Sequence, residues 1–329
     1  MIPVSNSQLP ALALGLPDSR RTAWSVAPSG EPKMHLPRLL PLPPETDRTL
    51  KQAGRAYWFP LHRSADAIAE PAAINMCADL VTYSNALASM ARTARSDLKI
   101  FNHPLVVQRC RPDIIGRVLM DVPGLEAPRT LALSITRPEE LRQAVDESGL
   151  SYPFILRNGA SASEADAVVI GSDNDWKRAD DLAWWRDGRV TISQLDRSDL
   201  QQHIRLRVCV AGRQVQTQAF PFRHGGHALV QGVPMPRGPG KEALGQIIKA
   251  IVTRVPLDFW SFDLVLKDGG VARFDQFWVG LPGLSSETGS PSNPVSRALW
   301  NRVGPKMDAL LRDPESWRSF ERPPPATTH

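Results

Sequence analysis

The sequence predicts an α+β fold, and three features of the chain support this class. Apolar and polar residues alternate with period two over five segments of the second half, namely 190–195, 204–210, 213–220, 259–266 and 271–278. The turn signals Ala211-Gly212 and Asp268-Gly269-Gly270 can join successive strands as hairpins. Helical patterns over 242–255 and 293–311 stand among these strands. Hairpins mixed with helices favour α+β layers over a purely parallel sheet.

The first third of the chain predicts an extended segment followed by an N-terminal α/β subdomain. Residues 1–50 are rich in proline and lack periodicity, which indicates an extended segment. The subdomain is expected over 51–115. Its predicted elements are a helix over 70–93 with Pro71 in the first turn, a short strand over 98–101, and the start of a helix over about 107–120.

The middle of the chain predicts a small subdomain over 116–190. Thr136 begins a helix, since Pro138 suits its first turn and Glu139 completes a capping box. Strands are expected over 153–157 and 167–170, with a loop of small residues between them. A second subdomain is expected over 191–312 and a flexible tail over 313–329.

Composition narrows the class of partner. The formal charge is +5 and the chain contains no block of Lys and Arg, which disfavours nucleic acid and fits an anionic ligand such as a nucleotide. Three separated cysteines argue against a disulfide framework or a zinc site. The chain has neither a long apolar stretch nor a basic start followed by an apolar run, so we expect a cytoplasmic protein without membrane contact. The oligomeric state is not indicated.

The last hairpin carries the strongest chemical signal. With a loop of three residues, Lys267 opposes Val271, and Asp263 opposes Asp275 across the ladder. Facing carboxylates repel, and a divalent cation such as Mg²⁺ between them would relieve the repulsion. Two alternatives stay open: both acids face solvent, or one of them pairs with Arg273. A two-residue loop would instead place the acids on opposite faces.

This hairpin resembles the final hairpin of the ATP-grasp superfamily. Phe262-Asp263-Leu264, the Asp-Gly turn and Phe274-Asp275 carry the resemblance. It implies that Asp263 and Asp275 hold the metal ions that neutralise the ATP phosphates. The family places an Asn two residues after the second acid, whereas this chain has Phe277 there, which cannot ligate a metal. An Asn at position 277 is therefore expected to raise metal affinity.

The resemblance continues upstream over roughly residues 98–284. Arg117 and Arg157 correspond to the two phosphate-contacting lysines of the family; the alternative for either is a solvated surface charge. The loop that begins with Gly159 and contains Ser161 resembles the flexible loop that covers the phosphates. Gln194 and Asp196 fall in the adenine hinge, and Leu206-Arg207-Val208 resembles a strand whose arginine faces phosphate or substrate carboxylate.

The resemblance implies an ATP-grasp-like fold, in which two α+β subdomains clasp a nucleotide cleft behind an N-terminal α/β segment. It also implies an ATP- and Mg²⁺-dependent carboxylate–amine ligase that acts through an acyl phosphate, with Arg207 as the catalytic residue. The sequence does not identify the carboxylate or the amine, and a peptide is among the substrates that the family uses. The alternative is a catalytically degenerate nucleotide-binding or scaffold protein, which Phe277 and the glycine-poor loop favour.

Overall fold

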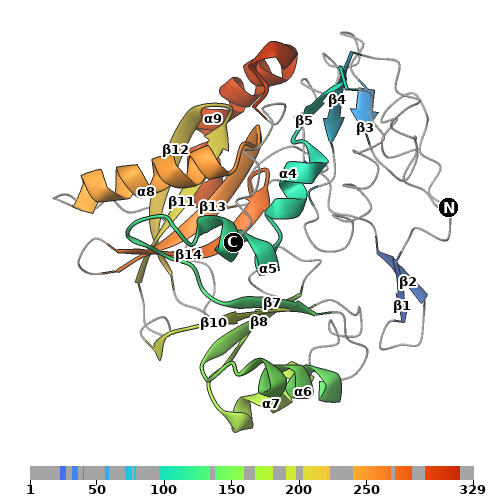
Figure 1. Cartoon of the computed structure of the whole chain (residues 1–329), viewed down its shortest axis with the longest axis vertical. Helices are drawn as coiled ribbons and strands as arrows, with labels where there is room; N and C mark the ends of the chain where they lie inside the picture. The colour runs from blue at the N-terminus through green and yellow to red at the C-terminus, as the bar shows by residue number, and fades with distance from the viewer. Residues whose placement is uncertain are drawn as a thin grey trace.

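The computed structural model shows an α+β molecule, in which the described part of the chain forms four β-sheets and six α-helices (Figure 1). The described residues are 23–26, 32–35, 40, 56–58, 71–75, 78, 96–133, 138–158, 167–180, 190–197, 203–222, 240–267, 271–283 and 293–318. The α+β class predicted from the sequence is confirmed.

The largest sheet has five strands in the order β12-β11-β13-β14-β6. Its strands are β11 (His203–Ala211), β12 (Gln214–Phe222), β13 (Phe259–Leu266), β14 (Ala272–Val279) and the short β6 (Leu125–Glu126). The first four are antiparallel, and β6 pairs in parallel with β14. Successive hairpins build this sheet, which is why its strands could be predicted from period-two alternation.

Helices cover both faces of this sheet. Leu244, Ile247 and Ile251 of α8 (Gly240–Arg254) pack in one core cluster with Val208 and Phe262. On the other face, residues of α9 (Pro294–Arg312) share a second cluster with β11, β12 and β13. Alternate residues of each strand therefore enter different cores, so the register decides which side chains meet.

The second sheet has four antiparallel strands in the order β7-β10-β8-β9. They are β7 (Thr130–Leu133), β8 (Phe154–Asn158), β9 (Ala167–Ile170) and β10 (Val190–Gln194). Two helices, α6 (Pro138–Ser148) and α7 (Trp176–Asp180), contribute to its core. Because β10 is a central strand here, this sheet reaches beyond residue 190, where the sequence analysis places the subdomain boundary.

The N-terminal region contains a parallel sheet of β3 (Ala56–Trp58), β4 (Ala72–Asn75) and β5 (Lys99–Phe101). The predicted helix over 70–93 is wrong at β4, whose four residues are all buried. A short apolar run does not distinguish a buried strand from a buried helix. A two-stranded hairpin of β1 (Ala23–Val26) and β2 (Pro32–His35) lies within the segment expected to be extended.

The helical stretch expected near 107–120 is two helices, α4 (Pro104–Arg109) and α5 (Pro112–Leu119). A proline begins each of them, and because the residue before a proline is disfavoured in helical conformation, Pro112 favours a break between the two helices.

Asn102 connects this region to the large sheet. Its φ of 51° lies in the left-handed region, which Asn tolerates better than most residues. Its side-chain oxygen accepts from the backbone of Asp258 and Phe259 at 2.9 Å each, and its amide donates to the Phe259 carbonyl at 3.0 Å. These contacts fix the β5–α4 turn against the start of β13.

The beginning of the segment expected as a tail packs onto the core. Trp317 is buried and meets Phe101 edge-on at 5.3 Å between ring centroids. The backbone N–H of Arg318 donates to Asp258. No helix in the described part of the chain is long and apolar enough to cross a membrane.

Candidate functional site

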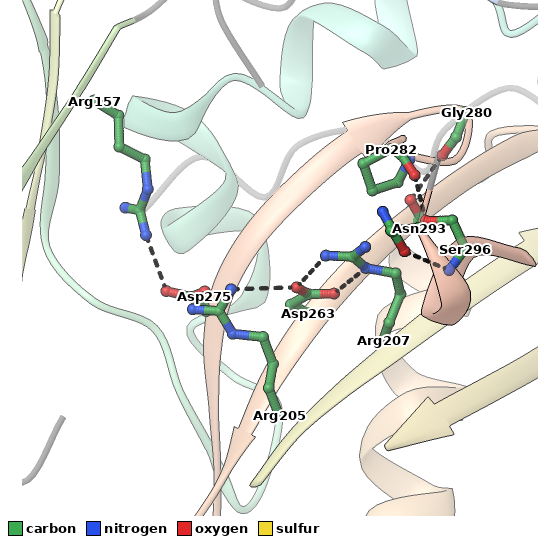
Figure 2. A network of polar contacts seen from close by, with 10 residues as sticks. Arg157, Arg205, Arg207, Asp263, Asp275, Gly280, Pro282, Asn293 and Ser296 are labelled. Atoms are coloured by element: carbon green, nitrogen blue, oxygen red, sulfur yellow. Dashed lines mark hydrogen bonds and ion pairs between the residues drawn. The ribbon is translucent and has the colours of Figure 1, made fainter. Parts of the chain in front are cut away.

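Four of the residues singled out from the sequence meet where the two larger sheets adjoin, together with one arginine that was not (Figure 2). We call this group the seam network. It consists of Arg157 on β8, Arg205 and Arg207 on β11, Asp263 on β13 and Asp275 on β14.

Asp263 is fully buried and held mainly by Arg207. The guanidinium of Arg207 donates in a bidentate manner, from Nε to Oδ1 at 2.9 Å and from Nη2 to Oδ2 at 2.8 Å. Arg205 Nη1 lies 3.5 Å from the same Oδ2. Paired strands explain this contact, since Arg207 stands directly opposite Asp263 in the β11–β13 ladder.

Asp275 lies between two arginines from different sheets. Arg205 Nη2 is 2.7 Å from its Oδ2, and Arg157 Nη2 donates to its Oδ1 at 3.3 Å. The side chains of Arg157 and Asp275 are 8% and 6% exposed, so this ion pair is largely withdrawn from water. Arg157 is thereby the member of the network that connects the four-stranded sheet to the five-stranded sheet.

Aromatic rings support the two arginines of β11. The Cζ atom of Arg205 lies 3.2 Å from the ring centroid of Phe222, and that of Arg207 lies 4.8 Å from the centroid of Trp278 and 5.4 Å from that of Phe220. Guanidinium groups stack favourably on aromatic faces. Period two places Arg205 and Arg207 on one face of β11, where Phe222 and Phe220 of β12 lie against them respectively.

The register of the β13–β14 hairpin differs from the predicted one. Lys267 N–H donates to the Val271 carbonyl at 3.0 Å, as the three-residue loop requires. However, the register shifts between Asp263 and Leu264, so that Asp263 stands opposite Gln276, and Asp275 is the extra residue of a bulge. The predicted direct opposition of Asp263 and Asp275 is therefore wrong, although both carboxylates reach Arg205.

The bulge also exchanges the faces of Phe277 and Trp278. Phe277 joins the α8-side core, where its ring stacks on Trp260 at 5.1 Å between centroids. Trp278 lies on the face of the seam network, over Arg207. Uninterrupted alternation along β14 would give the opposite faces, because one inserted residue reverses the alternation of side chains. Phe277 consequently does not stand at a ligand position beside Asp263 and Asp275.

The charges around Asp263 and Asp275 do not fit a Mg²⁺ ion bound between these two carboxylates. Burial raises the pKa of Asp263, while Arg207 and Arg205 offset part of that increase. Two guanidinium groups already contact each carboxylate, and Arg205 lies between them. Mg²⁺ requires oxygen ligands at about 2.0–2.1 Å in octahedral geometry. In the part of the chain that the structure describes, no group of three His, Cys, Asp or Glu side chains could hold a metal ion. The metal role expected for Asp263 and Asp275 is therefore not supported by their surroundings.

A second group of charges borders the network. Arg273 donates to the Gln194 carbonyl, which joins β14 to β10. Lys267 Nζ contacts Asp196 at 2.6 Å and Glu126 at 2.7 Å. These ion pairs are more exposed than the seam network, with Asp196 and Glu126 side chains 58% and 50% exposed. Burial lowers the pKa of Arg273, and Asp275 and Asp196 offset part of that decrease.

The structure places the other predicted site residues as follows. Gln194 uses its side-chain amide to donate to the carbonyls of Ser151 and Pro153, at 2.6 and 3.1 Å. Asp196 pairs with Lys267, which lowers the pKa of Asp196. Arg117 is an exposed residue in the last turn of α5, and it is not among the residues that contact the seam network. Gly159 and Ser161 lie outside the described residues.

Arg205 is the member of the network that the sequence analysis omits. A signal for it exists, because Arg205 precedes Arg207 by two residues and must share its face of the strand. Arg273 was predicted only as an alternative partner for an acid; in the structure it donates a hydrogen bond to the Gln194 carbonyl of the neighbouring sheet.

Comparisons with known protein families and with curated proteins find no match for this chain. Among solved structures, the chain is similar to an ATP-grasp RimK domain protein of Sphaerobacter thermophilus, with 15% identity, TM-score 0.44, and coverage of 74% of this chain and 80% of that one. It is also similar to the D-alanine–D-alanine ligase of Helicobacter pylori, with 15% identity, TM-score 0.46, and coverage of 78% and 73%.

A third similar structure is the D-alanine–D-alanine ligase of Bacillus anthracis, with 12% identity, TM-score 0.48, and coverage of 78% and 83%. The first of these three structures is described as an ATP-grasp protein. At these sequence identities and TM-scores, the activity of this chain has to be inferred from its own side chains.

Proposed function

We propose that the protein binds a nucleotide, with ATP as the expected ligand, and that the phosphates lie against the arginines of the seam. The observation that carries this proposal is a concentration of buried arginine side chains in the described part of the chain, two of whose neighbouring donors lack a hydrogen-bond partner there. Arg157, Arg205, Arg207 and Arg273 are all at least 92% buried, and among the described residues Asp263 and Asp275 form ion pairs with the first three of them.

A phosphate group suits this arrangement chemically. Arginine binds phosphate oxygens in a planar, often bidentate manner, and such charge-assisted bonds are stronger than neutral ones. At the seam network, Nε of Arg157 and Nε1 of Trp278 are buried donors without a hydrogen-bond partner among the described residues. Buried donors are nearly always paired in proteins, and phosphate oxygens would supply the acceptors.

The remaining sequence assignments belong to the same proposal. Gln194 is the last residue of β10 and Asp196 follows it, beside Lys267 and Arg273, so the base of the nucleotide would lie at this end of the seam. The loop with Gly159 and Ser161 would cover the phosphates, and Arg117 would contact them. In this proposal the protein is a catalytically degenerate, ATP-grasp-like nucleotide-binding protein. Asp263 and Asp275 form ion pairs with the arginines and do not hold a metal ion.

The experiment is calorimetric titration of the purified protein with ATP and ADP. Arg157→Met should weaken binding by about tenfold to a hundredfold, because a hydrogen bond to a charged group contributes about 1.5–3 kcal/mol. Arg178→Met is the matched control, since the Arg178 side chain is 62% exposed and pairs only loosely with Asp175 at 4.0 Å. Equal ATP affinity in wild type and Arg157→Met, or absence of nucleotide binding by the wild type, would refute the proposal.

A second candidate is ATP- and Mg²⁺-dependent carboxylate–amine ligation, which one observation favours. The amide oxygen of Gln276 is buried without a hydrogen-bond partner among the described residues, and Gln276 stands opposite Asp263 in the ladder. An amide oxygen is a ligand that Mg²⁺ accepts. Here Arg207 would orient the acyl phosphate, and the substrates would be a carboxylate and an amine, a peptide among them.

Phosphate release separates the two candidates. The protein is incubated with ATP, Mg²⁺ and mixtures of amino acids and short peptides. Turnover that requires Mg²⁺ and is lost in Arg207→Met would establish the ligase. ATP binding without such turnover supports the binding protein.

A further inference from the structure

Arg205 occupies the space between the two acidic side chains. Its Nη1 lies 3.5 Å from Asp263 Oδ2, and its Nη2 lies 2.7 Å from Asp275 Oδ2. One planar guanidinium therefore faces carboxylates on two neighbouring strands at once (Figure 2). This is the position that a shared divalent cation would need.

The guanidinium is fixed in that position. Arg205 is 0% exposed, and its Cζ lies 3.2 Å from the Phe222 ring centroid. Its backbone belongs to β11, an internal strand between β12 and β13. Movement of the side chain away from the carboxylates would have to break these contacts and leave a buried cation without its counter-ions.

The negative charge of the Asp263 and Asp275 carboxylates is thus already compensated by arginine. The carboxylates of Asp263 and Asp275 lie on adjacent strands and repel one another unless a cation lies between them. Arg205 supplies a single positive charge there, Arg207 supplies a second on Asp263, and Arg157 a third on Asp275. A metal ion would add two further positive charges to a place where guanidinium groups already outnumber the carboxylates, and it would also collide with Arg205.

We propose that Arg205 is a built-in cation that takes the place of a divalent metal between Asp263 and Asp275. The protein then binds no divalent ion at this pair, and removal of the guanidinium uncovers a latent metal site. Carboxylate oxygens keep lone pairs beyond those that Arg207 and Arg157 use, so the uncovered pair could still ligate an ion. This inference does not rest on the proposed nucleotide function.

The test uses Mn²⁺ as the probe and the full chain without nucleotide. Electron paramagnetic resonance measures the sharp signal of free Mn²⁺, which is lost when the ion binds. The samples are wild type, Arg205→Met, Arg205→Lys and the surface control Arg178→Met. Methionine keeps an unbranched side chain against Phe222, whereas lysine keeps a positive charge. Melting temperatures with and without Mn²⁺ give an independent readout.

We expect the free Mn²⁺ signal to persist with wild type, Arg205→Lys and Arg178→Met. With Arg205→Met the signal should decrease, and Mn²⁺ should raise the melting temperature. Adding Asp275→Asn to Arg205→Met should abolish both effects, which assigns the ion to this pair.

Two results would overturn the inference. The first is Mn²⁺ binding by the wild type that Asp275→Asn abolishes. The second is a folded Arg205→Met protein that binds no Mn²⁺. If Arg205→Met folds only in the presence of Mn²⁺, the inference is supported. If Arg205→Met never folds, Mn²⁺ titrations of the wild type and of Asp275→Asn decide whether the Asp263–Asp275 pair binds a divalent ion. Failure of nucleotide binding would leave all of these outcomes unaffected.

Discussion

At the scale of single residues, His103 caps a helix in a way that makes the stability of the fold depend on pH. It is the N-cap of α4, and its neutral Nδ1 accepts from the Leu105 N–H at 3.3 Å. Burial lowers the pKa of His103 from 6.5 to about 4. Protonation would turn this acceptor into a donor that faces the positive end of the helix.

The first prediction concerns stability in mild acid. Since the folded-state pKa is lower than the unfolded one, the unfolded chain binds more protons between pH 6.5 and 4. The contribution of His103 is complete above pH 6.5 and is lost as the pH falls toward about 4. At pH 5 the expected loss is up to about 2 kcal/mol. Urea unfolding at pH 7.5 and pH 5 measures it. His103→Asn keeps a capping oxygen and should remove most of this pH dependence; an unchanged pH dependence in that variant would contradict the assignment.

The second prediction concerns Asp263. If Asp263 and Asp275 had only each other as neighbours, Asp263→Asn would leave the stability of the fold unchanged or raise it, because the repulsion between the two carboxylates would disappear. The structure reverses this expectation, since the substitution leaves Arg207 and Arg205 buried beside an uncharged amide. Loss of one partner of a buried ion pair costs about 3–5 kcal/mol. Asp308→Asn is the control, because its pair with Arg312 is exposed and should contribute less than about 1 kcal/mol. Equal melting temperatures for the two variants would show that the seam network does not stabilise the fold.

At the scale of elements, the sequence predicts regular hairpins well and their irregularities poorly. The predicted segment 259–266 coincides with β13, and 167–170 coincides with β9. Alternation and turn residues are local signals, so they suffice for such strands. The bulge at Asp275 has no such signal, since it arises from how β13 and β14 fit together. For the same reason the burial of β4 between two other strands could not be read from its apolar run.

The third prediction tests the face that the bulge gives to Phe277. Its ring is 7% exposed and stacks on Trp260 in the α8-side core. Phe277→Asn should therefore cost about 3–5 kcal/mol through a cavity and a buried amide, and it should add no metal affinity. Phe277→Leu, which retains an apolar side chain, should cost distinctly less. A Phe277→Asn protein that is as stable as Phe277→Leu and gains Mg²⁺ affinity would place residue 277 beside the carboxylates instead.

At the scale of the whole molecule, polar contacts join the two larger sheets. Arg157 reaches Asp275, Arg273 reaches the Gln194 carbonyl, and Lys267 reaches Asp196. The sequence pointed to Arg157, Arg207, Asp263 and Asp275 as chemically important, but it could not show that they neutralise one another. That outcome depends on side-chain geometry across strands that lie as far as 118 residues apart.

The fourth prediction measures this connection by a double-mutant cycle. Arg157→Met and Asp275→Asn, singly and together, should show a coupling free energy of about 1–3 kcal/mol in urea unfolding. Arg178→Met combined with Asp275→Asn should be additive within about 0.5 kcal/mol, since Arg178 belongs to the exposed surface of α7. Additivity in both cycles would mean that the Arg157 contact does not hold the sheets together.

The most direct test of the whole account is a crystal structure grown with ATP and Mn²⁺ and measured at a wavelength where manganese scatters anomalously. We predict nucleotide phosphates against Arg157, guanidinium density of Arg205 between Asp263 and Asp275, and no anomalous peak at that pair. An anomalous peak within about 2.0–2.6 Å of both carboxylates, with Arg205 displaced, would contradict the account.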